Sequence, residues 1–325
     1  MPYLFSLRGK FAKRDRADGS VDNGGATRYN IVMNRSLRLK AFCKANLSLN
    51  ITGVRSGMHE IDSVMTSLDA YDTVTVTERG DDEIHVAFVN ATGISESDNT
   101  AYRAAKAVRN ALGFGGWDIV IEKGIPIGAG LGGSSADGAA VLRALDVFYR
   151  LPARGVDMRK TALSIGSDVP FMLTGGLARV RGTGDDLFFI ENKLPLFAIG
   201  LMDGGVSTRE CYAEFDRQGG SGKASDTDRL CECLLGGDEQ SVRYFGNALF
   251  EPACALNVGI KTCAEKLKAA GAIVNMTGSG GMVLGWFTDI NKFLSAAARL
   301  KSERGFGVFA PARTGVLHEW LTEKE

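Results

Sequence analysis

The stretch IPIGAGLGGSSADGAAVLRAL, Ile125 to Leu145, decides the fold of this chain, because a glycine-rich turn leads directly into an alanine-rich helix. Glycines let a phosphate approach the backbone, and the N–H groups and dipole of the helix start attract it. Serine hydroxyls at that position can donate to a phosphate or bind its magnesium. Five glycines and serines occur from Gly130 to Ser135. An ordinary serine N-cap needs fewer, so the stretch favours a phosphate site.

Two other phosphate-binding motifs fit the stretch less well. Gly128, Gly130 and Gly133 match GxGxxG, but a dinucleotide-binding fold needs a strand that enters the first glycine directly and a second strand with an acid roughly 20 residues later. Pro126 precedes the turn, and no such strand follows the helix, which is expected to end near Arg150. A Walker A loop would contain GK[ST], which this loop lacks. A nicotinamide dehydrogenase is therefore disfavoured.

The composition indicates a protein that handles a small molecule. The 325 residues are 45% hydrophobic and 23% charged, and at this length two domains are expected. Basic and acidic residues number 38 each, so no net field steers the chain to nucleic acid or to an anionic membrane. Six cysteines without a CxxC pair, and three histidines, disfavour a zinc site. We expect reduced thiols, a cytoplasmic location and no membrane partner, since no apolar run approaches roughly 18 residues.

The first 36 residues differ from the rest, because they mix basic residues and glycines without a sustained hydrophobic period. This pattern predicts a disordered extension over residues 1–36. Asp15, Asp18 and Asp22 argue against a transit peptide, which is poor in acids. Translation from Met33, just ahead of the first convincing strand, is the alternative.

A strict alternation from Leu37 to Ile51 predicts a long strand. Its apolar residues share one face of the strand. The opposite face carries polar residues and by itself is typical of a solvated strand: Lys44, Asn46, Ser48 and Asn50.

Strands and helices are mixed through the rest of the first half. Residues 72–89 are predicted to form two strands joined by a polar turn, and residues 117–127 a further strand. A helix to Leu112 is predicted between them, with Ser97 or Asp98 as its N-cap. We expect antiparallel pairing among these strands.

The second half is expected to form a separate lobe. Strands are predicted near residues 194–202, 272–276 and 283–287, and helices near 239–249 and 259–270. These elements suggest a four-stranded antiparallel sheet backed by helices. The glycine- and serine-rich segment GGSGKASDTD is typical of an exposed linker or loop.

The loop resembles the PxGxGLGxS(S) motif of the GHMP kinase superfamily. Other segments are similar to its 4-diphosphocytidyl-2-C-methyl-D-erythritol kinase family, in the same order from Leu37 to Ala312: AFCKANLSLNITGVRSGMHEIDSVMTSLDAYD, IGSDVPFMLTGGLARVRGTGDDL, GVSTRECYAEFD and NMTGSGGMVLGWF. The resemblance implies an α+β, two-domain GHMP kinase fold. Residues 37–190 would form the N-terminal, ribosomal-S5-like, ATP-binding domain, and residues 191–325 the C-terminal, ferredoxin-like domain.

The resemblance also implies the reaction, ATP-dependent phosphorylation of the 2-hydroxyl of 4-diphosphocytidyl-2-C-methyl-D-erythritol on the non-mevalonate route to isoprenoid precursors. Lys44 would stand beside the reacting hydroxyl and the transferred phosphoryl group, and Asp168 would orient or deprotonate the hydroxyl. Phosphoryl transfer needs such a pair, because it depends on positioning and charge neutralisation. Without the resemblance, Asp168 ahead of Val169 and Pro170 indicates a helix cap.

Further site residues follow from the resemblance alone. Asn46, Met58 and His59 would contact the substrate, with His59 at the cytosine ring. A second glycine turn, Gly278, Ser279 and Gly280, would face the active site. ATP and Mg²⁺ are the implied cofactors, with Ser135 as one candidate magnesium ligand. The implied ATP-binding residues are Asn99, Lys123, Pro126, Gly128, Gly130, Leu131, Gly132, Gly133, Ser134 and Ser135.

Met58 is the main departure from the family pattern, because it stands where the family has a tyrosine stacking on cytosine. A thioether offers no flat face to a base. Two alternatives therefore stay open. The first is another small-molecule GHMP kinase of the mevalonate or homoserine type, and the second is a non-catalytic GHMP-fold protein that binds a metabolite or nucleotide. We expect a monomer or homodimer.

Overall fold

The computed structural model describes residues 35–91, 99–191, 196–220, 224–312 and 314–320. The extension predicted over residues 1–36 lies outside this range except for its last two residues, and Ser36 already opens strand β1 (Ser36–Arg55). Among the described residues, no helix combines the length and apolar character needed to cross a membrane.

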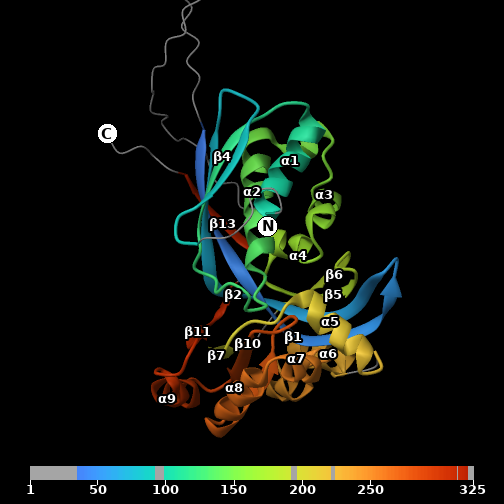
Figure 1. Cartoon of the computed structure of the whole chain (residues 1–325), viewed down its shortest axis with the longest axis vertical. Coiled ribbons are helices and arrows are strands. Elements are labelled where there is room, and N and C mark those ends of the chain that lie inside the picture. The colour runs from blue at the N-terminus through green and yellow to red at the C-terminus, as the bar shows by residue number, and fades with distance from the viewer. Residues whose placement is uncertain (1–34, 92–98, 192–195, 221–223, 313, 321–325) are drawn as a thin grey trace, which may run out of the picture.

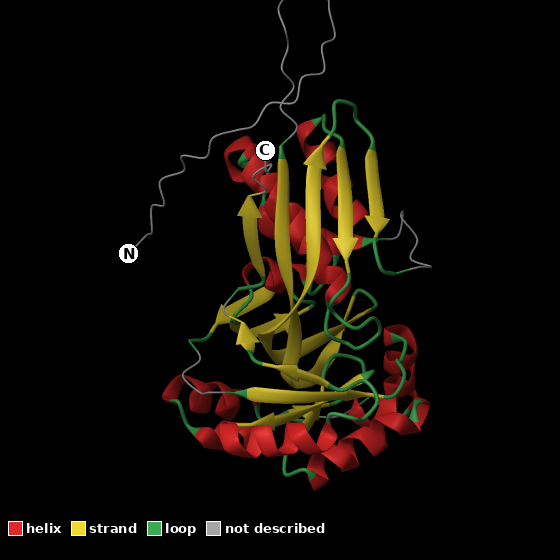
Figure 2. Cartoon of the chain, turned by 90° about the vertical axis from the view of Figure 1, so that its left-hand side faces the viewer, coloured by secondary structure: helices red, strands yellow, loops and turns green. Residues whose placement is uncertain are grey.

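A long antiparallel hairpin organises the first sheet (Figures 1 and 2). It consists of β1, as predicted from the alternation, and β2 (Met58–Glu78). The main strand order is β13-β1-β2-β4-β3, with β3 (Ile84–Phe88), β4 (Trp117–Glu122) and β13 (Val316–Trp320). Shorter strands pair with members of this sheet: β5 (Leu177–Gly182) and β12 (Pro311–Ala312) with β2, β6 (Asp186–Phe189) with β5, and β8 (Gly246–Asn247) with β1.

Antiparallel pairing prevails in this sheet, but β3 lies parallel to β4, so the expectation of antiparallel pairing is wrong there. Parallel strands need a crossover rather than a tight turn. Here the chain passes through helix α1 (Thr100–Leu112) between β3 and β4, and β3 lies at the outer edge of the sheet.

Helices cover one face of the first sheet (Figure 1). They are α1 (Thr100–Leu112), α2 (Gly133–Tyr149), the 3-10 turn Leu151–Arg154, α3 (Met158–Ile165) and α4 (Val169–Thr174). The end of α2 before Arg150 is confirmed. The N-cap of α1 is Asn99, whose side-chain oxygen accepts from the Ala101 N–H at 2.7 Å. The predicted caps, Ser97 and Asp98, lie outside the described residues.

The second sheet has the order β11-β7-β10-β9 and is antiparallel throughout, as predicted. Its strands are β7 (Phe197–Met202), β9 (Ile273–Met276), β10 (Met282–Phe287) and β11 (Gly307–Phe309). The helices of this lobe are α5 (Thr208–Arg217), α6 (Thr227–Gly236), α7 (Phe250–Leu256), α8 (Val258–Ala269) and α9 (Ile290–Leu300).

The helix predicted near residues 239–249 is wrong. A 3-10 turn, Glu239–Tyr244, is followed by strand β8. Tertiary contacts explain why this segment is not a helix. The Asn247 side-chain nitrogen donates to the carbonyl oxygens of Met276 and Gly278, both at 2.8 Å. These bonds hold the segment extended beside the second glycine turn.

Strand β1 links the two lobes. Most of its apolar face belongs to the core of the first lobe, but Leu49 packs in the core of the second. The opposite face, expected to be solvated, is buried as well: Lys44, Asn46, Ser48 and Asn50 are each at most 4% exposed. The boundary near residue 190 stays a prediction. Strands β12 and β13 pair with β2 and β1, so the chain returns to the first sheet near its end.

Candidate active site

The glycine loop turns its carbonyl groups toward the protein. The carbonyl oxygens of Ala129, Gly130 and Leu131 accept from Met282 N–H at 3.1 Å, Thr277 Oγ1 at 3.2 Å and Lys44 N–H at 3.0 Å, respectively. Within the described residues, the N–H groups of Gly130, Leu131 and Gly132 donate to no protein acceptor. A row of unused N–H groups that ends in a helix N-terminus is suited to an anion.

Gly130 fits this loop for two reasons. Its φ is +74°, and a Cβ added there would lie 2.3 Å from the carbonyl oxygen of Thr277. We expect Gly130→Ala to weaken ATP binding at least about tenfold, because the loop must shift to relieve the clash. The matched control is Gly113→Ala, which has a φ of +78° and open space around the added Cβ. Equal ATP affinity in the two variants, measured by calorimetry, would contradict the expectation.

Lys44 and Asp168 meet at the end of this loop. Lys44 Nζ lies 3.6 Å from Asp168 Oδ2, and the Lys44 side chain is 5% exposed against 28% for Asp168. The stem of Lys44 packs over the loop, since a Cβ at Gly132 would lie 3.1 Å from Lys44 Cγ. Asp168 occupies the N-cap position of α4, yet its side chain makes no capping hydrogen bond. The carboxylate therefore remains available to a ligand.

Asn46 holds Lys44 in place. Its side-chain oxygen accepts from Lys44 Nζ at 2.7 Å and from Gly278 N–H at 3.0 Å. Its nitrogen donates to Ser63 Oγ at 2.8 Å. The oxygen is therefore already occupied, and the contact of Asn46 with substrate stays a prediction.

The second glycine turn lies against the first. Gly278 and Gly280 belong to the turn between β9 and β10, and a Cβ at Gly278 would lie 2.8 Å from the carbonyl oxygen of Gly130. Ser279 Oγ lies 2.8 Å from Thr208 Oγ1, at the start of α5. The two glycine segments, from different lobes, thus touch backbone to backbone beside Lys44.

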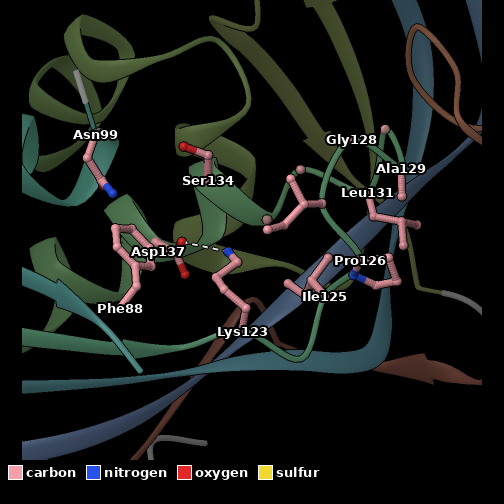
Figure 3. Close-up of a pocket in the computed structure, with 14 residues that line it drawn as sticks. Phe88, Asn99, Lys123, Ile125, Pro126, Gly128, Ala129, Leu131, Ser134 and Asp137 are labelled. Atoms are coloured by element: carbon pink, nitrogen blue, oxygen red, sulfur yellow. Dashed lines mark hydrogen bonds and ion pairs between the residues drawn. The ribbon is translucent and has the colours of Figure 1, made fainter. Parts of the chain in front are cut away.

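A cavity opens on the other side of the glycine loop (Figure 3). It is lined by all of the expected ATP-binding residues except Ser135, and also by Phe88, Ile125, Ile127, Ala129 and Asp137. Asn99 points its side-chain nitrogen toward this cavity in Figure 3, because its oxygen is used in the cap of α1. Ser135 faces the turn before Asp168 instead, since a Cβ at Gly166 would lie 4.0 Å from its hydroxyl.

A buried charge cluster forms the floor of this cavity. Lys123 Nζ donates to Asp72 and, at 2.8 Å, to Asp137. Asp72 also accepts from the N–H groups of Gly124 and Ile125 at 2.7 and 2.8 Å. Neither carboxylate was predicted as part of the site. Both side chains accept hydrogen bonds from Lys123, so the cluster fixes the chain entering the glycine loop.

Burial raises the pKa of Asp137 to about 8, and the charge of Asp72 adds to the effect while Lys123 opposes it. The unfolded chain releases the Asp137 proton near pH 4, whereas the folded protein keeps it up to about pH 8. Between these two pH values, the contribution of Asp137 to the free energy of unfolding therefore falls as pH rises. The amide of Asp137→Asn needs no proton. The free energy of unfolding of this variant, minus that of the wild type, should therefore be at least about 1 kcal/mol larger at about pH 8.5 than at about pH 5. A difference independent of pH, in denaturant titrations, would contradict this assignment.

Met58 and His59 begin strand β2 at the far end of the hairpin. Met58 is 57% exposed. The His59 ring lies 4.6 Å from the ring of Tyr212, tilted by 31°, and burial together with the charge of Asp168 raises the pKa of Tyr212. Tyr212 therefore contacts the His59 ring and is affected by the charge of Asp168. It was not predicted as a site residue, although it stands in the quoted GVSTRECYAEFD segment.

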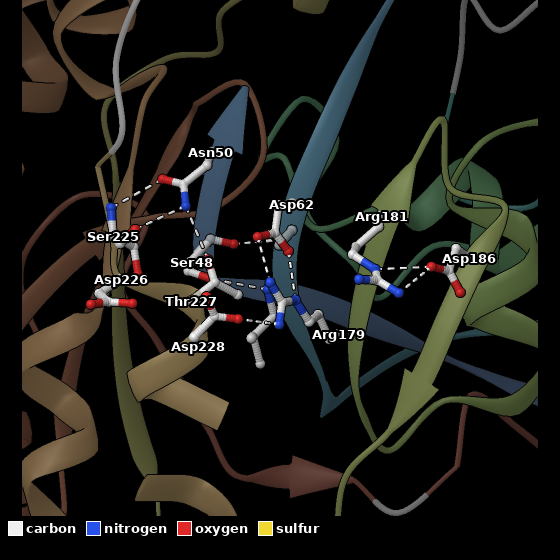
Figure 4. Close-up of polar contacts among 12 residues, drawn as sticks. Ser48, Asn50, Asp62, Arg179, Arg181, Asp186, Ser225, Asp226, Thr227 and Asp228 are labelled. Carbon is white, nitrogen blue, oxygen red and sulfur yellow. Dashed lines mark hydrogen bonds and ion pairs between the residues drawn. The ribbon is translucent and has the colours of Figure 1, made fainter. Parts of the chain in front are cut away.

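Polar contacts hold the second lobe beside this hairpin (Figure 4). The side-chain nitrogen of Asn50 donates to the Ser225 carbonyl at 2.9 Å and to Thr227 Oγ1 at 3.0 Å. Arg179 of β5 pairs with Asp228 of α6 at 2.7 Å. The expectation of an exposed linker is therefore wrong for its last part, because Ser225 and Thr227 are buried; residues 221–223 lie outside the described range.

A glycine cradle for phosphate and an adjacent lysine–aspartate pair define a small-molecule kinase of the GHMP class. Residues 99–176 match the GHMP kinases N terminal domain. The chain is 34% identical over 273 residues to a 4-diphosphocytidyl-2-C-methyl-D-erythritol kinase of Alkaliphilus metalliredigens (strain QYMF), with 82% of this chain and 93% of the relative covered. It is 35% identical over 269 residues to that of Pelotomaculum thermopropionicum (strain DSM 13744 / JCM 10971 / SI), with 80% and 92% covered. The chain belongs to the 4-diphosphocytidyl-2-C-methyl-D-erythritol kinase family.

Solved structures agree with this membership. A crystal structure of 4-(cytidine 5'-diphospho)-2C-methyl-D-erythritol kinase superposes with a TM-score of 0.70 at 30% identity, covering 85% of this chain and 99% of the other. A homoserine kinase from Cytophaga hutchinsonii superposes with a TM-score of 0.68 at 18% identity, covering 90% and 100%. The second likeness supports the fold alone.

Proposed function

We propose that this protein transfers the γ-phosphoryl group of ATP to the 2-hydroxyl of 4-diphosphocytidyl-2-C-methyl-D-erythritol, a step toward isoprenoid precursors. The observation that carries the proposal is the approach of Lys44 Nζ to Asp168 Oδ2, 3.6 Å apart. The pair lies at the end of a loop in which the N–H groups of Gly130, Leu131 and Gly132 have no acceptor among the described residues. Positioning and charge neutralisation are what phosphoryl transfer requires of a protein.

We propose a part in the reaction for each group. The hydroxyl oxygen of the acceptor attacks the γ-phosphorus, the bond from that phosphorus to the bridging oxygen breaks, and ADP leaves. Asp168 orients the hydroxyl and takes its proton. Lys44, held by Asn46 at 2.7 Å, neutralises charge on the transferred group. The N–H groups of residues 128–135 hold the phosphates.

Magnesium is proposed as the second cofactor. Within the described residues, no cluster of three or more His, Cys, Asp or Glu side chains could hold a metal ion, which fits a cation held mainly by the phosphates with few protein ligands. Ser135, whose hydroxyl faces the turn before Asp168, would supply one ligand. Bound there, magnesium would add neutralisation of the phosphate charge.

The cytidine end of the substrate is proposed to lie near His59. Met58 offers a flexible thioether in place of an aromatic face. Tyr212 supplies a flat ring next to His59, and an aromatic ring of this kind can stack on a base. Although Met58 offers no aromatic face, Tyr212 could therefore stack on the cytosine.

Two alternatives differ from this proposal in substrate or in activity. A kinase of the mevalonate or homoserine type would use the same Lys44–Asp168 pair on a smaller alcohol. A non-catalytic binding protein would not need that pair, so the pair favours an enzyme. We further propose a cytoplasmic location and a monomer or homodimer.

One assay separates the three functions. The protein is incubated with ATP, Mg²⁺ and, in separate reactions, the cytidylated alcohol, mevalonate or homoserine, and ADP release is followed. Product with the cytidylated alcohol alone supports the proposal. ADP release that depends on mevalonate or homoserine would favour the other kinase, and saturable binding without turnover would favour the binding protein.

A further inference from the structure

A carboxylate from the second lobe is hydrogen-bonded to the His59 ring. Its Nε2 lies 2.9 Å from Asp216 Oδ1. The two residues come from β2 and α5, which are far apart in the sequence. The His59 side chain is 18% exposed and that of Asp216 is 56% exposed, so the pair lies at the rim of the site rather than in the core.

The orientation of the imidazole ring is fixed by one face of α5. Tyr212 and Phe215 lie 4.6 and 6.2 Å from its centre, the first tilted by 31° and the second nearly perpendicular. Asp216 follows on the same helix, and residues three and four apart share a helix face. Three side chains of α5 thus hold the ring and its Nε2 atom.

The hydrogen bond determines which nitrogen of the ring carries the proton. A carboxylate can only accept, so Nε2 must be the N–H donor. A neutral imidazole then has an unprotonated Nδ1, which is an acceptor. Within the described part of the chain, Nδ1 of His59 has no protein partner, so this acceptor is open to a ligand.

We propose that Asp216 is a positioning residue that sets substrate specificity, by holding His59 in the tautomer whose Nδ1 accepts from an amino-pyrimidine. Cytosine carries an exocyclic amine, which donates, where uracil carries a carbonyl oxygen, which accepts. An acceptor such as Nδ1, placed opposite this group of the base, binds the cytosine amine and repels the uracil carbonyl oxygen. The inference rests on the proposed function, since it concerns the cytidine end of that substrate.

The first measurement compares the cytidine substrate with its uridine counterpart in the full-length protein. We expect Asp216→Ala to lower the ratio of kcat/KM for the cytidine substrate to kcat/KM for the uridine substrate by about tenfold or more. The reason is that the His59 ring, without Asp216, can adopt either tautomer. Glu210→Ala is the matched control, since it removes a carboxylate from an exposed position on the same helix and should leave the ratio unchanged.

The second measurement reads the tautomer without substrate. The chain has three histidines, so the ¹⁵N NMR signals of His59 can be assigned with His59→Gln. For the neutral ring, we expect a protonated Nε2 in the wild type and a mixture of tautomers in Asp216→Ala. A role confined to protein stability would not change this signature.

Each outcome decides the inference. A falling ratio together with a protonated Nε2 supports it. Turnover with an unchanged ratio in Asp216→Ala, or a wild-type His59 protonated on Nδ1, overturns it and leaves the proposed function intact. If the wild-type protein turns over neither the cytidine nor the uridine substrate, the proposed function is contradicted, and so is the specificity role of Asp216.

Discussion

Asp168→Asn is expected to lower kcat by about a hundredfold or more while ATP still binds, because an amide cannot take the proton of the acceptor hydroxyl. Asp168 makes no capping bond to α4, so its replacement should not cost the stability that removal of an N-cap costs. Steady-state ADP release gives kcat, and calorimetric titration gives ATP affinity.

Asp157→Asn is the matched control for this variant. Asp157 is the N-cap of α3 and accepts from Lys160 N–H at 3.0 Å. Asparagine caps helices as well as aspartate does, so both activity and stability should stay near those of the wild type. Near-normal turnover in Asp168→Asn would remove the base from the proposed mechanism.

Lys44→Met is expected to lower kcat by about a hundredfold to a thousandfold, because it removes a preorganised cation from the transferred phosphoryl group. Methionine keeps the apolar stem that packs over Gly132, and Asn46 keeps its bond from Gly278 N–H. The loop should therefore retain its shape. Stopped-flow measurement of a single turnover separates the chemical step from product release.

Lys40→Met serves as control for the loss of a lysine from the same strand. Lys40 lies on β1, with its Nζ 5.0 Å from the centre of the Tyr71 ring, and it is not part of the site. If Lys44→Met and Lys40→Met reduce turnover equally, the effect comes from strand β1 as a whole and not from charge at the phosphoryl group.

Local signals in the sequence were sufficient for much of the fold. The alternation after Leu37 predicted β1, and the glycine loop predicted the start of α2. Both depend on neighbours along the chain. The antiparallel sheet of the second lobe also followed, because its strands are short apolar segments between turns.

Features that depend on contacts between distant segments were not predicted. The polar face of β1 is buried by distant segments; for example, residues more than 170 positions later cover Asn50. Asp72 and Asp137 join the site through Lys123, which pairs with each of them. Tyr212 becomes part of the site only where α5 meets His59. No local period marks such pairings.

The most direct measurement of the central claim is a crystal structure of the protein with a non-hydrolysable ATP analogue and 4-diphosphocytidyl-2-C-methyl-D-erythritol. We expect the phosphates on the N–H groups of residues 128–135, with Lys44 Nζ at the γ-phosphate and the 2-hydroxyl about 3 Å from the Asp168 carboxylate. Phosphates bound elsewhere, or a 2-hydroxyl out of reach of Asp168 even through one water, would contradict the proposed phosphoryl transfer.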